Sequence, residues 1–386
     1  MREGRVCIGV VACDEGGDRL GAQLIAGLQR QRPALRFVGM AGARMQAQGG
    51  ESYRAIEQPS AHDVQTALRG ARSLRSLRTR LIRSLCDARP ALCICVGAPE
   101  LNVQVGRALR GAGVPSVHYA GPAVWNWRIW RVRRIASCLS HVLAVLPIEA
   151  AAYKDAGIPA TFVGHPLADS VPLDVDKAAA RAQLRLPTGK RIVVLIPGER
   201  SAEIRSTGEV FVKAAHRFHS EMPDVHFVLP VTSRRNREHL ESALRFQGNA
   251  EFPLTLLFGH ANEALAAADF ALVSSEAASL AAMLFRTPMI LAQPKLTITR
   301  TWSRQLMCGP TVGLPNRLAG EGIVPELQRR QVTPWAIAVA LMSLMDDAQA
   351  QRRQVKRFGE IHSMLRQDSA AKASAAVLGL LTHAAP

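Results

Sequence analysis

Short runs of apolar residues alternate with amphipathic segments along most of the chain. In the first half, runs rich in β-favouring residues predict strands at residues 6–12, 36–40, 92–96, 114–120, 141–146 and 161–163. Because several of these runs are not interrupted by polar residues, the strands should be buried on both faces, as in a parallel sheet. Amphipathic helices are expected between them, for example at residues 19–31, where Leu20, Leu24 and Leu28 share one face.

The same alternation continues in the second half of the chain. Strands are predicted at residues 191–196, 225–229, 254–258, 270–274 and 288–291, a loop at 311–320, and helix from Thr333 onward. Pro172 and a shift in charge mark a domain boundary near residues 169–176. The pattern predicts an α/β fold with two doubly wound, Rossmann-like domains facing a cleft. We expect domains at residues 1–170 and 171–345, with C-terminal helices at 346–386 returning to the first domain.

The sequence after the run 92–96 indicates where the first domain binds its ligand. Gly97 and Pro99 stop the strand, and Glu100 opens a helical pattern. The loop therefore lies at the carboxyl end of a parallel strand, where open α/β sheets bind ligands. The first strand–loop–helix unit lacks a GxGxxG sequence, so no dinucleotide cofactor is expected.

Two loops of the second half could bind phosphate groups. Residues 197–203 (PGERSAE) lead into a helix, whose exposed N–H groups together with Arg200 suit a phosphate. Residues 274–280 (SSEAASL) have the same position after a later strand and could face the same ligand. Many α/β loops look like this, but two of them in one domain suggest a nucleoside diphosphate site. No cluster of metal-ligating residues is recognisable, so group transfer without a metal or other cofactor is expected.

The charge of the chain predicts an acidic partner. Its 48 Lys and Arg residues exceed its 31 Asp and Glu residues, giving a net charge of +17. Trp125, Trp127 and Trp130 alternate with Arg128 and other arginines, which suits a lipid–water interface. Base stacking on nucleic acid or packing between domains would also use such tryptophans. Likewise, the arginine-flanked helical region 61–88 could lie on an anionic membrane or present a solvated basic face.

Cysteine usage and the N-terminus indicate a reducing compartment. The seven cysteines include no CxxC pair, the chain enters its first strand without a signal peptide, and it lacks a run of about 18 apolar residues. A cytoplasmic location is expected.

Several motifs, modest individually, are specific in their order and spacing and cover nearly the whole chain. They are residues 17–22 (GDRLGA), 37–42 (FVGMAG), 98–102 (APELN), 118–128 (HYAGPAVWNWR), 163–169 (VGHPLAD), 197–203 (PGERSAE), 314–320 (LPNRLAG) and 324–328 (VPELQ). With these motifs the sequence resembles the lipid-A-disaccharide synthase family, glycosyltransferases of the GT-B fold.

The resemblance implies a reaction and a set of site residues. A UDP-linked 2,3-diacylglucosamine would give its sugar to 2,3-diacylglucosamine 1-phosphate, forming lipid A disaccharide 1-phosphate and UDP at the inner face of the bacterial inner membrane. A homodimer is a further expectation, and no nucleic acid partner is expected. The implied donor-binding residues are Pro197, Gly198, Arg200, Glu203, Ser275, Asn316 and Gln328, and the acceptor-binding residues are Gly17, Asp18, Asn102, Trp125 and Arg128.

The sequence departs from the family pattern at positions where chemistry is expected. Gly97 stands where the family has the aspartate that is the usual candidate for activating the acceptor hydroxyl, and Glu100 is a displaced substitute. The first loop, Gly-Glu-x-Ser-Gly-Asp in the family, reads Cys-Asp-Glu-Gly-Gly-Asp over residues 13–18. Donor-side departures are Glu199, Glu276, Leu280 and Gln293. Two hypotheses follow: an active synthase with a rearranged base, or a catalytically impaired paralogue that binds a lipid or a partner.

Overall fold

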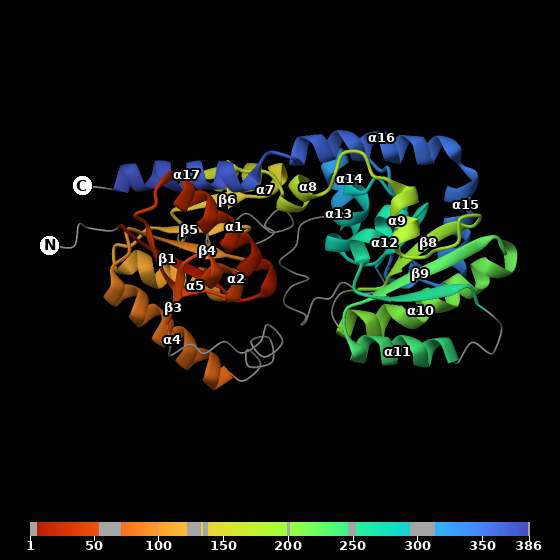
Figure 1. Ribbon diagram of the computed structural model, residues 1–386, viewed down its shortest axis with the longest axis horizontal. Coiled ribbons are helices and arrows are strands. Elements are labelled where there is room, and N and C mark those ends of the chain that lie inside the picture. The colour runs from red at the N-terminus through yellow and green to blue at the C-terminus, as the bar shows by residue number, and fades with distance from the viewer. Residues whose placement is uncertain are drawn as a thin grey trace. The chain divides into compact units, whose positions relative to one another are not determined.

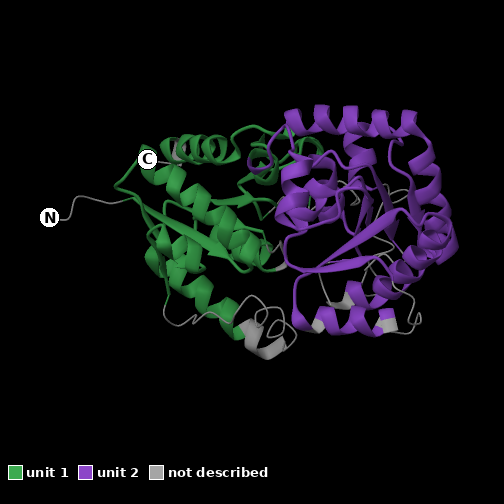
Figure 2. Ribbon diagram, turned by 45° about the vertical axis from the view of Figure 1, so that its right-hand side comes forward, with its two compact units in different colours: residues 1–169, 306–309, 365–386 green, residues 170–305, 310–364 purple. Residues whose placement is uncertain are grey.

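The computed structural model describes residues 6–53, 71–97, 99–121, 133, 138–198, 201–245, 252–293 and 313–384 (Figure 1). The chain forms two compact units (Figure 2). Unit 1 contains the described residues up to Asp169 and those from Leu365 onward, and unit 2 contains the described residues between them. Each unit has its own parallel sheet, which confirms the predicted α/β class with two doubly wound domains.

Unit 1 contains a seven-stranded sheet in the order β3-β2-β1-β4-β5-β6-β7. All its pairings are parallel. The strands are β1 (Cys7–Ala12), β2 (Arg36–Met40), β3 (Gly50–Ser52), β4 (Leu92–Val96), β5 (Ser116–Tyr119), β6 (His141–Ala144) and β7 (Ala160–Phe162). Every residue of β4 is buried, as its unbroken apolar run predicts.

The helices of unit 1 connect these strands and cover the sheet. They are α1 (Glu15–Gln31), α2 (Ala43–Ala47), α4 (Ala71–Ala88), α5 (Pro99–Gly111), α7 (Pro147–Asp155), α8 (Pro166–Ser170) and α17 (Ser369–Ala384). Leu81 and Leu85 of α4 pack with Val105 of α5 and with Cys93 and Cys95 of β4 in one buried cluster. This part of the arginine-flanked stripe therefore belongs to the core; residues 61–70 lie outside the described residues.

Unit 2 contains a six-stranded parallel sheet in the order β10-β9-β8-β11-β12-β13. Its strands are β8 (Arg191–Ile196), β9 (Val225–Val231), β10 (Leu254–Phe258), β11 (Phe270–Val273), β12 (Met289–Gln293) and β13 (Glu326–Gln328). The helices are α9 (Lys177–Gln183), α10 (Ser201–Glu221), α11 (Arg234–Arg245), α12 (Ala261–Ala267), α13 (Glu276–Leu284), α14 (Leu314–Ala319), α15 (Pro334–Asp346) and α16 (Ala348–Leu365), with a 3-10 turn η3 (Arg329–Gln331). Phe211 and Phe218 of α10 and Leu341 of α15 pack against strand residues in one core.

Two sequence-based expectations need adjustment. Residues 314–319 form α14, so the predicted loop at 311–320 is wrong there; Pro315 lies in the first turn, where its missing N–H breaks no helical hydrogen bond. The predicted C-terminal segment 346–386 is divided, because residues 346–364 belong to unit 2 and the chain joins unit 1 at Leu365. None of the helices in the described ranges combines the length and apolar character needed to cross a membrane.

Candidate active site

The strand orders identify one ligand-binding position in each unit. In unit 1, β1 pairs with β2 on one side and β4 on the other, so chain connections diverge from the β1/β4 boundary. In unit 2 the corresponding boundary lies between β8 and β11. Doubly wound sheets bind ligands outside the carboxyl ends of the strands at such a switch point. The loops after β1 and β4 therefore form the candidate site of unit 1, and the loops after β8 and β11 form that of unit 2.

At the switch point of unit 1, Asp14 follows β1 and is the N-cap of α1. Its Oδ1 accepts a hydrogen bond from the Gly17 N–H at 2.6 Å, which satisfies a free donor of the first helical turn. Gly97 follows β4 with a φ of +57°. A Cβ atom at Gly97 would lie 3.7 Å from Oδ2 and 3.8 Å from Oδ1 of Asp14. The structure therefore brings the side chain of Asp14 directly beside the position where residue 97 lacks one.

Two predicted acceptor-binding residues form hydrogen bonds with backbone groups of unit 1. Asp18 is buried, and its carboxylate accepts the N–H groups of Arg44 at 2.9 Å and Met45 at 3.0 Å at the start of α2. Asn102 is fully buried and donates from Nδ2 to the carbonyl of Gly97 at 2.7 Å. Gly17 is buried in α1. Trp125, Arg128 and the side chain of Glu100 lie outside the described residues.

Three other titratable groups near this edge of unit 1 are also tied to the backbone. Asp169, after β7, accepts N–H groups of Gln367, Asp368 and Ser369 at 2.9, 3.0 and 2.7 Å and so holds the start of α17. Burial raises the pKa of Glu149 to about 8, although its Oε2 accepts two backbone N–H groups. Burial lowers the pKa of His165 to about 4, and its Nδ1 accepts the N–H of Leu167 at 3.2 Å. These groups act as structural anchors.

In unit 2 the loop after β8 contains the predicted residues Pro197 and Gly198. Gly198 has a φ of +145°, and a Cβ there would lie 2.5 Å from the Cβ of Glu203 on α10. A side chain at position 198 is therefore excluded by both backbone conformation and space. The carbonyl of Pro197 accepts a hydrogen bond from Thr207 Oγ1, which fixes the loop to α10. Arg200 lies outside the described residues.

The loop after β11 meets the β8 loop at the same edge. The N–H of Ser274 donates to the carbonyl of Ile196 at 3.1 Å. Ser275 begins α13, and its Oγ accepts the Ala278 N–H at 3.1 Å. Burial raises the pKa of Glu276 in the first turn, and the charge of Arg317 opposes that shift.

Asn316 and Gln328 lie on the neighbouring elements of the same edge. The buried amide of Asn316 donates to the Val324 carbonyl and to Glu326 Oε1, and accepts the N–H groups of Ile323 and Val324. Gln328 ends β13 beside Gln293 of β12 and donates to Glu326 Oε2 at 3.1 Å. Asn316 thus has all its hydrogen-bonding capacity used within unit 2 and shapes the site through the backbone.

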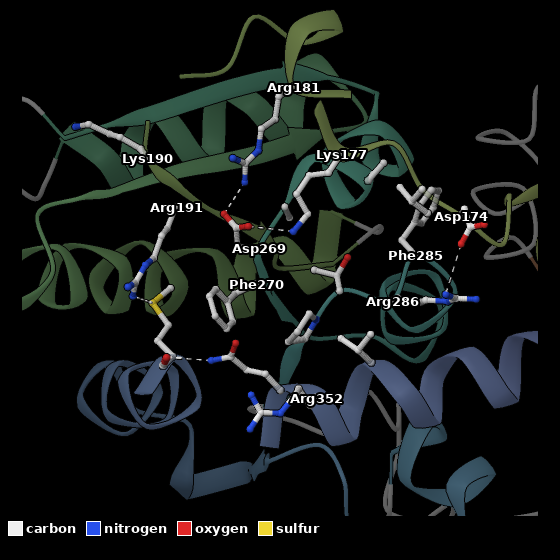
Figure 3. A pocket seen from close by; sticks show the side chains of 18 of the residues that line it. Asp174, Lys177, Arg181, Lys190, Arg191, Asp269, Phe270, Phe285, Arg286 and Arg352 are labelled. Atoms are coloured by element: carbon white, nitrogen blue, oxygen red, sulfur yellow. Dashed lines mark hydrogen bonds and ion pairs between the residues drawn. The ribbon is translucent and has the colours of Figure 1, made fainter. Parts of the chain in front are cut away.

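A cavity of about 1000 Å³ lies elsewhere in unit 2 (Figure 3). It is lined by the first residues of β8 and β11, Arg191 and Phe270, so it lies at the amino ends of the strands. In Figure 3 Asp269 lies between Lys177 and Arg181 and pairs with them at 3.0 and 2.5 Å. Because the candidate loops are at the carboxyl ends, this cavity is not the predicted donor site.

Solved structures share this architecture. A UDP-GlcNAc 2-epimerase from Neisseria meningitidis bound to UDP-GlcNAc matches with a TM-score of 0.62 at 12% identity, over 98% of this chain and 99% of that one. MurG from Acinetobacter baumannii matches with a TM-score of 0.55 at 14% identity, over 98% and 99%. The two parallel sheets, each with its own switch point, define the GT-B fold. A family model described as lipid-A-disaccharide synthetase matches residues 8–379, and the chain belongs to this family.

Sequence relatives support the same assignment over nearly their full length. The lipid-A-disaccharide synthase of Pseudomonas paraeruginosa is 42% identical over 378 residues, covering 98% of this chain and 99% of the relative. That of Aromatoleum aromaticum is 40% identical over 380 residues, covering 97% and 96%. The resemblance recognised in the sequence motifs is confirmed.

One functional candidate was missed by reasoning from the sequence. Asp14 appeared there only as part of a loop that departs from the family pattern, while the helix was expected to begin at residue 19. The helix begins at Glu15, and an aspartate directly before a helix is a signal for an N-cap. Its position beside Gly97 needed the order of the strands, which the sequence did not provide.

Proposed function

We propose that the protein is an active lipid-A-disaccharide synthase. It transfers the sugar of UDP-2,3-diacylglucosamine to 2,3-diacylglucosamine 1-phosphate and releases UDP. The observation that carries this proposal is the match to synthases at about 40% identity across nearly the whole of both chains. The strand order of each sheet, with its switch point, agrees with it.

Unit 2 is the proposed donor-binding unit. Helices α10 and α13 both begin at its switch point, so their first N–H groups and the positive ends of their dipoles favour a diphosphate there. These groups stabilise the charge that develops on UDP as it leaves. Gly198 allows the β8 loop to pack closely against Glu203 in the first turn of α10, which fixes the loop at the start of this helix. Arg200, Glu203, Ser275, Asn316 and Gln328 complete the proposed donor set.

Unit 1 is the proposed acceptor-binding unit. During transfer a hydroxyl oxygen of the acceptor forms a bond to the anomeric carbon of the donor, the bond from that carbon to the diphosphate breaks, and UDP leaves with the electron pair. The hydroxyl proton must pass to a base. Gly17, Asp18 and Asn102 shape this position, with Trp125 and Arg128 proposed to contact the lipid.

The proposed location is the cytoplasmic face of the inner membrane. Both substrates are acidic amphiphiles, and a net charge of +17 favours binding to an anionic lipid surface. The expected homodimer stays a prediction.

The purified protein should convert the two lipid substrates to a disaccharide 1-phosphate and UDP, detected by mass spectrometry. Circular dichroism and UDP binding measured on the same preparation serve as controls. A folded protein that binds UDP and forms no disaccharide would contradict the proposal and favour the catalytically impaired paralogue.

A further inference from the structure

We infer that Asp14 is the general base that accepts the proton of the acceptor hydroxyl; this inference rests on the proposed function. A base for this reaction needs a place at the switch point of unit 1 and a basic atom that a substrate hydroxyl can reach. Asp14 and four other described titratable groups near the carboxyl edge of this sheet differ in how they meet these two requirements.

Four groups fail at least one requirement. Asp18 is buried and uses both carboxylate oxygens to accept backbone N–H groups of α2. Asp169 uses both oxygens in the same way for the turn before α17 and follows β7, away from the β1/β4 boundary. Glu149 is buried after β6, and His165 is tied to the N–H of Leu167 after β7.

Asp14 meets both requirements. It lies two residues after the end of β1 at the switch point and is partly exposed. Oδ1 holds the first turn of α1, whereas Oδ2 forms no hydrogen bond with another described residue. One carboxylate oxygen therefore fixes the orientation of the group and the other remains available to a substrate.

Gly97 leaves open the space in front of this carboxylate. A Cβ built at Gly97 has only the two carboxylate oxygens of Asp14 within 4 Å among described atoms, at 3.7 and 3.8 Å. A hydroxyl group entering this space would come within hydrogen-bonding reach of Oδ2. A larger residue at position 97 would occupy the space instead. The glycine and the aspartate thus form a complementary pair, one making room and the other supplying the acceptor atom.

The proton transfer is balanced without a further reactant. As the acceptor oxygen bonds to the anomeric carbon, its proton passes to Asp14 Oδ2, and the electron pair of the breaking carbon–oxygen bond leaves with UDP. Asp14 then returns the proton to solvent. Its position at the partly exposed end of β1 provides the route.

The decisive variant is Asp14→Asn. Asparagine is as good an N-cap as aspartate, so α1 and the melting temperature should be preserved while the basic oxygen is lost. We expect kcat to fall about 10²–10⁴-fold, the usual contribution of a general base, with little change in KM for either lipid. Glu15→Gln is the matched control, because Glu15 is the next residue and its side chain is 79% exposed; it should retain wild-type activity.

Gly97→Asp in the Asp14→Asn background tests the position of the base. Aspartate tolerates a φ of +57° better than most residues, and its carboxylate would enter the same space from the other loop. We expect recovery of at least about tenfold in kcat. Three outcomes would overturn the inference: Asp14→Asn activity within threefold of wild type, an unchanged kcat with a raised acceptor KM, or loss of activity only in Glu100→Gln. An inactive wild type would instead contradict the proposed function.

Discussion

The two switch points are built from different chemical groups. At the carboxyl edge of unit 1, carboxyl groups receive backbone N–H donors: Asp14, Asp18, Glu149 and Asp169. In unit 2, the hydroxyl oxygen of Ser275 and the amide oxygen of Asn316 accept the equivalent backbone N–H groups. Glu326 is the exception, and its Oε1 accepts from both Asn316 and the Gly313 N–H.

This difference follows from what each unit is proposed to bind. A diphosphate is repelled by fixed carboxylates, so neutral groups are the better anchors beside a donor nucleotide. An acceptor hydroxyl needs a basic oxygen, which a carboxylate provides. The same fold can therefore supply two half-sites, and the groups that hold its loops distinguish them.

The largest effect is expected when a charge is introduced into the neutral anchor of unit 2. Asn316→Asp removes the donor to Glu326 Oε1, which lies 2.6 Å from Nδ2, and places two carboxylates in contact. Like charges about 4 Å apart cost roughly 4 kcal/mol at an effective dielectric of 20, and the Val324 carbonyl also loses its donor. We expect the free energy of unfolding from urea titration to fall by about 3–4 kcal/mol.

Adding Glu326→Gln to this variant removes one of the two charges. The double variant should recover much of the lost stability, because a glutamine amide can donate to the new aspartate. If Asn316→Asp alone melts like wild type, the neutral character of the unit 2 anchor is not important for folding.

A smaller effect is expected from the buried acid of unit 1. Burial raises the pKa of Glu149 from 4.5 to about 8 in the folded protein. Between pH 4.5 and pH 8 the native state therefore binds one more proton at this group than the unfolded state does. Stability from this group is complete below pH 4.5 and is lost as the pH rises through 8. From pH 5 to pH 8 the free energy of unfolding falls by at most about 4 kcal/mol, because each pH unit contributes at most about 1.36 kcal/mol. Residual contact of the Glu149 carboxyl group with water should make the loss smaller.

Glu149→Gln should therefore flatten the fall in melting temperature between pH 5 and pH 8. Subtracting the pH profile of the variant from that of the wild type separates the contribution of Glu149 from that of His165. Burial lowers the pKa of His165 to about 4. The histidine acts with the opposite sign, because its contribution is lost as the pH falls from its ordinary value toward 4. Parallel pH profiles for the two proteins would show that Glu149 does not titrate in this range.

The strands were largely predictable because their sequence signal is local. The predicted limits of β2, β4, β8 and β10 agree with the structure, since unbroken apolar runs define buried parallel strands. The short edge strands β3 (GES) and β13 (ELQ) were missed because neither contains an apolar run. Helix α14 was missed because Pro315 and Gly320 also suit a turn, and only tertiary contacts of Asn316 distinguish the two.

The candidate site was less predictable than the fold. The loops after the strands were located correctly, but the roles of side chains within them depend on neighbours distant in sequence. Asp18 is an example: the family resemblance implied that it binds the acceptor, and only the structure shows that its carboxylate accepts backbone N–H groups 26 and 27 residues further along the chain. The relation of Asp14 to Gly97 likewise needed the pairing of β1 with β4.

The smallest effect is expected at a carboxylate of unit 1 that faces solvent. Glu51 on β3 pairs with Arg36 at 2.7 Å, and both side chains are about half exposed, at 56% and 50%. Exposed pairs contribute little, typically below about 1 kcal/mol, and are screened by salt. Glu51→Gln should therefore shift the urea midpoint slightly at low ionic strength and not measurably in 1 M salt. A large shift that persists in salt would mean that unit 1 depends on acidic side chains in general, rather than on those that hold backbone N–H groups at the carboxyl edge of its sheet.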